Sequence, residues 1–384
     1  MRYSSAATQS RQISRVPCTL PGGPEIILRL PGCVGCDERH DALFRALPRV
    51  LPSRVCILGS GITPTALWAA RSGAEVVCWI DSAAEAEMIR LSFDAADLPL
   101  PSILCTAHPE GLTPGMCSLA IVHLPRGRML QRELLEAAGA LVAPGGRVYF
   151  VGAKREGVKS ATDFARVLFG HAGILVRKGG WHVGMAINST AWDTIPMPKF
   201  TSADIVVDGA PTHLVACTGV FAPDRLDEGA QALVEAMHVK RDTHVLDLGC
   251  GTGVVALAAC RRGTRVDATD VSARAVASAR RTLEANGYPQ ARVHLCPGAQ
   301  AIPASSIDTV VTNPPFHRGH AVDFEIVEFF ITEAARVLHP GGELFLVANA
   351  FLDHSHRLRG AFNSVSIVHD TGRFRVWHGQ RGVR

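Results

Sequence analysis

The segment Asn313-Pro-Pro-Phe316 combines residue types that can hold an amino group and an aromatic ring. Two consecutive prolines fix their own φ angles at about −65° and keep the preceding residue out of the helical region, so the loop is rigid. The Asn313 side-chain oxygen and the Pro314 carbonyl oxygen can both accept hydrogen bonds from an NH2 group conjugated to a ring, which orients that group for reaction. Phe316 offers a face on which a base can stack, and His317 is a secondary candidate for substrate contact. We therefore predict catalytic roles for Asn313, Pro314, Pro315 and Phe316.

A second motif, Asp247-Leu-Gly-Cys-Gly-Thr-Gly253, follows an apolar strand pattern and precedes a helical run. Glycines at such a turn permit positive φ and let backbone N–H groups approach a ligand. The spacing alone is compatible with dinucleotides, phosphates or other cofactors, but no Walker lysine is present. We predict that Gly249, Gly251 and Gly253 contact a cofactor, and that Asp247 faces a cationic amino group on it.

Asp270 lies just after the next predicted strand, which covers residues 264–268. A carboxylate at this point can bind ribose hydroxyl groups, although an Asp at a strand end can also cap the following helix. Because the glycine turn lies upstream, we favour ribose binding and assign Val271 to the same site.

Strand and helix patterns alternate along the chain, which is typical of an open parallel sheet covered by helices on both faces. The pattern occurs twice at a nearly constant offset: Val245–Gly253 matches Val55–Thr63, and the Pro-Gly-Gly turn that starts at Pro340 matches the one that starts at Pro144. The first copy has Ile57 and His123 where the second has Asp247 and Asn313. We predict two tandem α/β Rossmann-like folds produced by duplication, a degenerate one over residues 1–195 and a catalytic one over residues 196–384.

Composition is consistent with this organisation. The chain has 384 residues, of which 47% are hydrophobic and 19% charged, values typical of a globular protein. No apolar run is long enough to span a membrane, and the N-terminal segment lacks the apolar core of a secretory signal. The net charge of +4 permits an RNA partner without requiring one.

Among the 11 cysteines, Cys33 and Cys36 form the one CxxC pair, and no second pair follows to complete a zinc site. We therefore expect reduced thiols, no metal and a cytoplasmic protein.

The second half resembles the class I S-adenosylmethionine-dependent methyltransferases over residues 240–350. The resemblance implies S-adenosylmethionine as the cofactor and Asn313–Phe316 as the methyl-transfer loop. Relatives often place a carboxylate near the adenine amine after the third strand, whereas this chain has Cys296-Pro-Gly-Ala-Gln300. We assign adenine recognition to the backbone N–H near Ala299. Methyltransferases with an Asn-Pro-Pro-aromatic loop act on adenine N6, guanine N2 or the side-chain amide of a protein glutamine.

Further segments are similar to the guanine-N2 methyltransferases of bacterial ribosomal RNA, among them Gly219–Gly229, Gly341–Leu352 and Val151–Ser160. That family also pairs a degenerate N-terminal domain with an active C-terminal one. Ala348–Leu352 and Thr371–Phe374 favour the members that act on 16S RNA (RsmC-like), while His317–Ala321 and Leu352–His356 are closer to those that act on 23S RNA (RlmG-like). We favour the 16S members. Protein glutamine N5-methylation and a non-catalytic RNA-binding assembly factor are the alternatives.

The resemblance implies ribosomal RNA or a ribosomal subunit as the partner, bound by a monomer or a homodimer. Lys154 and Lys159 of the first copy are predicted to contact RNA phosphates, which position a nucleic acid without specifying its sequence. The alternative is that the first domain only buttresses the second.

Overall fold

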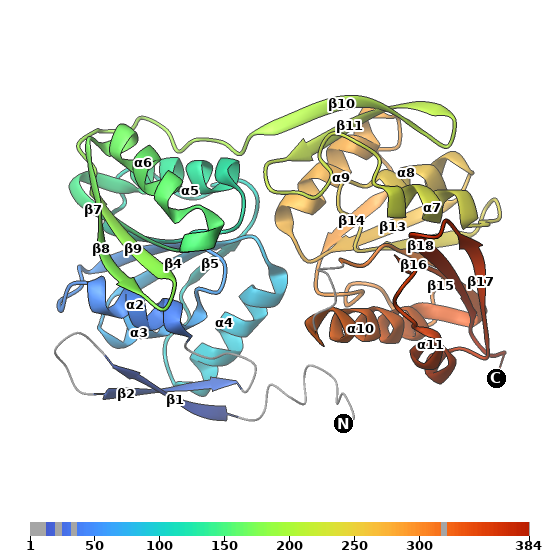
Figure 1. Ribbon diagram of the computed structural model, residues 1–384, viewed down its shortest axis with the longest axis horizontal. Coiled ribbons are helices and arrows are strands. Elements are labelled where there is room, and N and C mark those ends of the chain that lie inside the picture. The colour runs from blue at the N-terminus through green and yellow to red at the C-terminus, as the bar shows by residue number, and fades with distance from the viewer. Residues whose placement is uncertain (1–12, 20–24, 32–36, 316–320, 384) are drawn as a thin grey trace. The chain divides into compact units, whose positions relative to one another are not determined.

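The computed structural model describes residues 13–19, 25–31, 37–315 and 321–383, with side chains described over 37–315 and 325–383 (Figure 1). The chain divides into two compact units, Met1–Pro198 and Lys199–Arg384. Asn188 is fully buried, and its side-chain amide donates hydrogen bonds to the carbonyl oxygens of Gly139 and Val142. The first unit therefore extends past the strand that ends at Ile187.

The second unit contains a seven-stranded sheet of order β14-β13-β12-β15-β16-β18-β17. Neighbouring strands are parallel from β14 to β16, and β18 is antiparallel to both of its neighbours. The elements are β10 (Phe200–Val207), β11 (Ala210–Cys217), α7 (Glu228–Ala236), β12 (His244–Leu248), α8 (Val254–Arg261), β13 (Arg265–Asp270), α9 (Ala273–Ala285), β14 (Arg292–Leu295), β15 (Ile307–Thr312), α10 (Ala321–Val337), β16 (Leu338–Asn349), α11 (Ser355–Ala361), β17 (Ser364–Asp370) and β18 (Phe374–Gln380).

Two hydrophobic cores lie on opposite faces of this sheet. Alternate residues of each strand point to opposite faces, so Val245 of β12 packs with α7, α8 and α9, while Leu246 packs with α10 and α11. Strands covered on both faces are almost wholly buried, which explains their continuous apolar runs. The β10–β11 hairpin lies on α9, where the Ser278 hydroxyl accepts from the Cys217 N–H and donates to the Arg274 carbonyl oxygen.

The first unit repeats this architecture with a sheet of order β5-β4-β3-β6-β7-β9-β8 and a separate β1–β2 hairpin. Its elements are β1 (Ile13–Thr19), β2 (Glu25–Pro31), α2 (Glu38–Ala46), β3 (Arg54–Gly59), α3 (Thr63–Arg71), β4 (Glu75–Ile80), α4 (Ala83–Ala95), β5 (Ser102–Cys105), β6 (Cys117–His123), α5 (Arg128–Leu141), β7 (Val142–Ala153), the short 3-10 helix η1 (Lys154–Glu156), α6 (Val158–Phe169), β8 (His171–Lys178) and β9 (Trp181–Ile187).

The two sheets have the same strand order when their strands are counted along the chain, so the predicted fold class of two tandem α/β folds is confirmed. One numbering offset relates β4 to β13, which start at Glu75 and Arg265, and also relates α2 to α7, which start at Glu38 and Glu228. The offset is larger between β7 and β16, which start at Val142 and Leu338. The additional residues of the second unit therefore lie between β15 and β16.

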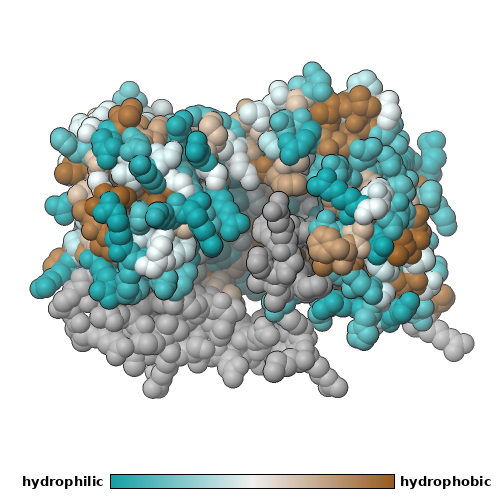
Figure 2. Space-filling model, in the orientation of Figure 1, coloured by the Kyte–Doolittle hydropathy of each residue, from teal (hydrophilic) through white to brown (hydrophobic). Residues whose placement is uncertain are grey.

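Within the described residues, no helix has the length and apolar character needed to cross a membrane. Hydrophilic side chains dominate the surface visible in Figure 2, with hydrophobic residues in small groups between them. Large exposed hydrophobic side chains include Phe221 and Phe351 of the second unit.

Candidate active site

The ends of β12 and β15 bring the two sequence motifs together. The strands are adjacent and parallel, and Leu248 is paired with Thr312. The Thr312 hydroxyl also donates a hydrogen bond of 2.7 Å to the Leu248 carbonyl oxygen. Gly249 and Asn313 each follow a member of this pair directly, so the glycine turn and the Asn-Pro-Pro loop begin side by side. Both lie at the carboxyl edge of the sheet, where ligands bind in open α/β folds.

The glycine turn has the backbone geometry that its sequence predicts. Gly249, Gly251 and Gly253 have φ angles of +80°, +55° and +80°, which residues other than glycine rarely adopt. A Cβ at Gly253 would lie 2.8 Å from the Cα of Ala279 in α9, so this position also needs glycine for close packing. A Cβ at Gly251 would meet no described atom within 4 Å. The turn therefore leaves open space beside Gly251, where a ligand could lie.

Asp247 lies at the buried end of β12, with a relative exposure of 2%. Its carboxylate accepts a hydrogen bond of 2.8 Å from the Ala256 N–H in the first turn of α8. Burial, reinforced by the nearby charge of Asp270, raises the pKa of Asp247 to about 7. A cationic group at this end of the sheet would favour the ionised carboxylate, so the site suits a ligand that carries an ammonium group.

Asp270 connects the end of β13 to the glycine turn. One of its carboxylate oxygens accepts a hydrogen bond from the Gly251 N–H, and the other accepts one from the Ser272 N–H, both at 2.9 Å. The capping residue of α9 is Ser272, whose hydroxyl accepts from the Ala275 N–H, rather than Asp270. Val271 beside it is 37% exposed. Asp270 thus lies at the glycine turn and holds its middle N–H group.

The loop after β14 is held by α10. Ala299 is fully buried, its N–H donates to the Glu333 carboxylate at 3.0 Å, and its carbonyl oxygen accepts from Arg336 at 2.6 Å. Glu333 and Arg336 form an ion pair of 2.9 Å. The Ala299 N–H therefore already has a partner within the chain. An adenine that contacts this N–H, as predicted, would have to compete with Glu333.

The Asn-Pro-Pro loop leaves the sheet at Asn313, which is half-buried, followed by the buried Pro314 and the exposed Pro315. The predicted residues Phe316 and His317 lie outside the described residues. The Asn313 side-chain nitrogen donates a hydrogen bond of 3.2 Å to a carboxylate oxygen of Asp227. Sequence reasoning missed Asp227; the signal available was its position before a helical run, which is typical of a helix N-cap.

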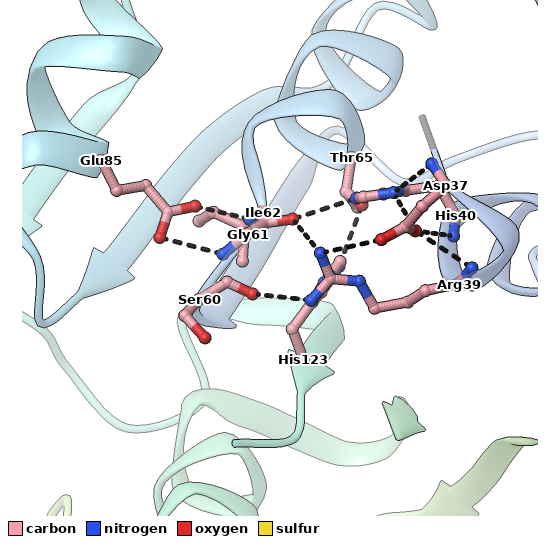
Figure 3. A network of polar contacts seen from close by, with 9 residues as sticks. All are labelled: Asp37, Arg39, His40, Ser60, Gly61, Ile62, Thr65, Glu85 and His123. Atoms are coloured by element: carbon pink, nitrogen blue, oxygen red, sulfur yellow. Dashed lines mark hydrogen bonds and ion pairs between the residues drawn. The ribbon is translucent and has the colours of Figure 1, made fainter. Parts of the chain in front are cut away.

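In the first unit, side chains of that unit occupy the equivalent turn (Figure 3). The Arg39 guanidinium donates to the carbonyl oxygens of Ser60 at 3.2 Å and Gly61 at 3.4 Å. The Glu85 carboxylate accepts from the N–H groups of Gly61 at 2.9 Å and Ile62 at 2.6 Å. Side chains from α2 and α4 therefore bond both N–H and carbonyl groups of this turn.

His123 stands in the first unit where Asn313 stands in the second. It is 1% exposed, and its ring contacts the Thr65 hydroxyl at 2.9 Å. Burial, with the charges of Arg39 and His40, lowers its pKa well below the usual value for histidine. A buried neutral ring in this position cannot present an amide oxygen to a substrate.

The predicted RNA-contacting residues lie in the first unit. Lys154 in η1 and Lys159 in α6 are both exposed. Cys33 and Cys36 lie outside the described residues. Among the residues that the structure describes, no group of three or more His, Cys, Asp or Glu side chains is placed to hold a metal ion.

Comparison with known proteins adds three findings. Residues 211–378 match the model of the methyltransferase small domain family. The chain is 33% identical over 278 residues to ribosomal RNA small subunit methyltransferase C of Pseudomonas entomophila, a match covering 72% of this chain and 82% of that protein. It is 32% identical to the protein of the same name from Hahella chejuensis, covering 65% of this chain and 75% of that one.

Among solved structures, the chain resembles the 16S rRNA N2 methyltransferase RsmC of T. thermophilus, determined in complex with AdoMet and guanosine. The TM-score is 0.83 at 26% identity, and the match covers 97% of this chain and 99% of the other. The similarity therefore includes both units.

Proposed function

The chain belongs to the ribosomal RNA small subunit methyltransferase C family, and we propose that it methylates the N2 amine of a guanine in 16S ribosomal RNA with S-adenosylmethionine as the methyl donor. The observation that carries this proposal is the pairing of Leu248 with Thr312, which sets the glycine turn beside the Asn-Pro-Pro loop. Family membership agrees with the sequence-based preference for 16S over 23S RNA, and for RNA over a protein glutamine.

We assign cofactor binding to the turn formed by Gly249, Gly251 and Gly253, together with Asp247, Asp270, Val271 and Ala299. The open space beside Gly251 and the two acidic side chains support the assignment, because the cofactor carries an ammonium group and ribose hydroxyls. When bound, S-adenosylmethionine supplies an electrophilic methyl group on its sulfonium.

The chain's own part in catalysis is to position a weak nucleophile. The lone pair of the guanine amine is delocalised into the ring, so the amine must be held in one orientation to react. The Asn313 side-chain oxygen and the Pro314 carbonyl oxygen accept its two N–H groups, while Pro315 keeps the loop rigid. Phe316 stacks on the base and His317 is a secondary contact. No general base is needed before transfer, since the amine is already neutral.

We propose that residues 196–384 form the catalytic domain and residues 1–195 a degenerate domain that supports it and binds RNA. Arg39 bonds to the glycine turn of the first unit, and its counterpart in the second unit is Gly229. The buried His123 stands where the second unit has Asn313. Both differences support loss of activity in the first unit. Lys154 and Lys159 would contact phosphates of ribosomal RNA or a ribosomal subunit. Such a substrate implies a cytoplasmic enzyme, and light scattering distinguishes a monomer from a homodimer.

The deciding experiment incubates the purified chain with radiolabelled S-adenosylmethionine and separated ribosomal subunits, followed by nucleoside analysis. Label in N2-methylguanosine from 16S RNA supports the proposal. Label in 23S RNA or in a protein glutamine would contradict the proposal and identify that molecule as the substrate. RNA binding without any label identifies the chain as a binding factor instead.

A further inference from the structure

We propose that Asp227 is a positioning residue that fixes the orientation of the Asn313 side-chain amide, a role that rests on the proposed function. Asp227 is the N-cap of α7, and one oxygen of its carboxylate is shared by three donors. The N–H groups of Gly229 and Ala230 lie at 3.1 and 3.3 Å from it, and the Asn313 nitrogen at 3.2 Å. The residue that starts the helix therefore also holds the catalytic loop.

The contact decides which end of the amide is available to the substrate. Only the nitrogen of an asparagine amide can donate a hydrogen bond, and an ionised carboxylate can only accept. The opposite orientation of the amide would place its oxygen against the negative charge of Asp227. The Asp227 carboxylate thus selects the orientation in which the Asn313 oxygen remains free to accept from the guanine amine.

Gly229 supports the same arrangement from the first turn of α7. A Cβ at this position would lie 3.0 Å from the bonded Asp227 oxygen and 3.3 Å from the Asn313 side-chain oxygen. Both distances are tighter than ordinary van der Waals contact. The absence of a side chain at Gly229 allows α7 to approach the Asn313 amide closely.

The first unit provides an internal comparison. Asp37, the counterpart of Asp227 in the repeat, caps α2 by accepting from the N–H groups of Arg39 and His40 at 3.0 and 3.3 Å. The same carboxylate contacts the His40 ring, whereas His123, at the position of Asn313, contacts Thr65. The cap is common to both units, but the link from cap to loop occurs in the unit that has the asparagine.

The test separates capping from positioning by replacing Asp227 with serine. Serine caps helices as well as aspartate does, but its hydroxyl is one bond closer to the backbone and does not reach Asn313. We expect Asp227→Ser to lower kcat for 16S RNA methylation by about 10- to 100-fold, as misplacement of a reacting group does. The dissociation constant for S-adenosylmethionine and the melting temperature should stay close to wild type. Asp37→Ser, the matched control, should leave kcat unchanged.

A double-mutant cycle shows whether Asp227 acts through Asn313. In an Asn313→Ala background, Asp227→Ser should change kcat by less than about twofold, because the amide that it orients is gone. An equal loss in both backgrounds would overturn the proposal. Gly229→Ala should also lower kcat, because its Cβ would displace the Asp227 and Asn313 side chains. Alanine is more favourable than glycine in a helix, and an unchanged melting temperature would show that the loss of kcat is not a loss of folding.

A measurement independent of activity completes the test. In full-length protein labelled with 15N-asparagine, the side-chain NH2 signal of Asn313, identified by its loss in Asn313→Ala, should shift in Asp227→Ser and not in Asp37→Ser. An unshifted signal would contradict the proposed contact. If wild-type protein fails to methylate 16S RNA, the proposed function fails, while this signal still decides whether Asp227 positions Asn313.

Discussion

The Arg39 guanidinium donates a hydrogen bond of 3.4 Å to the Gly61 carbonyl oxygen, so a side chain of the first unit lies across that unit's own glycine turn. The equivalent residue of the second unit, Gly229, has no side chain and approaches the Asn313 amide instead. At one repeated position, the first unit thus has an arginine that bonds to its glycine turn, and the second unit has a glycine that lies against the Asn-Pro-Pro loop.

Arg39 and Glu85 lead us to expect one S-adenosylmethionine per chain. Isothermal titration calorimetry on the full chain should give a stoichiometry near one. Arg39→Gly removes an exposed bond to Ser60 and a part-buried bond to Gly61. It should lower the free energy of unfolding by about 1 kcal/mol, the typical net contribution of an intramolecular hydrogen bond. It should not change kcat. A stoichiometry of two in wild-type protein would contradict this interpretation of the first unit.

Asn313→Ala should reduce kcat by about 100- to 1,000-fold, the loss seen when one preorganised hydrogen-bonding group is removed from an active site. Binding of S-adenosylmethionine should be little affected, because Asn313 is assigned to the substrate. Steady-state kinetics on 16S RNA and calorimetry with the cofactor measure the two effects separately. Unchanged kcat would remove Asn313 from the mechanism.

Asp247 should make the unliganded protein less stable as pH rises. Its pKa in the folded chain is about 7, above the usual value of 3.8, so the folded state binds the proton more tightly than the unfolded state. Its contribution is therefore fully present below about pH 4 and lost as pH rises through 7, a loss on the order of 4 kcal/mol. Asp247→Asn should remove this loss, as thermal unfolding between pH 4 and 8 would show.

Cofactor affinity should follow the opposite trend, because an ammonium group favours the ionised Asp247 carboxylate. Wild-type affinity for S-adenosylmethionine should rise as pH increases through 7, and Asp247→Asn should bind more weakly without this rise. Equal pH dependence in both proteins would show that Asp247 does not face the cofactor's charge.

Asp267, in the middle of β13, should make the folded protein less stable as pH falls, which is the opposite of the trend expected from Asp247. Burial by itself would raise its pKa, but hydrogen bonds from His244, Arg292 and His294, at 2.5, 2.5 and 2.6 Å, outweigh burial and lower it. Its stabilisation is therefore present above the pKa of an unfolded aspartate and is lost as pH falls below that value. Asp267→Asn should destabilise the protein by about 3 kcal/mol at neutral pH, measured by urea unfolding. If Asp267→Asn loses stability in acid as strongly as the wild-type protein does, Asp267 is not the source of the acid sensitivity.

Lys154 and Lys159 test the RNA-binding role of the first unit. Replacing both with alanine should weaken 16S RNA binding and reduce the slope of log affinity against log salt by about 2, one for each phosphate contact. Lys154→Arg with Lys159→Arg keeps both charges and should keep the slope. Filter binding at several salt concentrations gives the comparison. An unchanged slope in the alanine variant would favour the purely buttressing role.

Much of the fold could be predicted from the sequence because its signals are local and repeated. Apolar runs that end in glycine turns mark the buried parallel strands, and one numbering offset relates α2 to α7 as well as β4 to β13. The repeat itself implied two folds of one kind. The same local patterns identified Asp247, the glycine turn and the Asn-Pro-Pro loop.

Partners within the site were harder to predict, since hydrogen bonds of one side chain can be made by any residue that the fold brings near. The cap of α9 is Ser272 rather than Asp270, and the Ala299 N–H donates to Glu333. Neither partner can be predicted from residue spacing, because each depends on how a loop packs against a neighbouring turn or helix.

What the sequence determined by itself was the chemistry: a glycine turn with two acidic residues, and an asparagine held rigid by two prolines. Tertiary structure alone decided which groups meet. Asp227 reaches Asn313 across 86 residues of chain, and Arg39 reaches Gly61 across 22. The reason is physical: strand pairing and helix packing set the distance between side chains, whereas sequence separation does not.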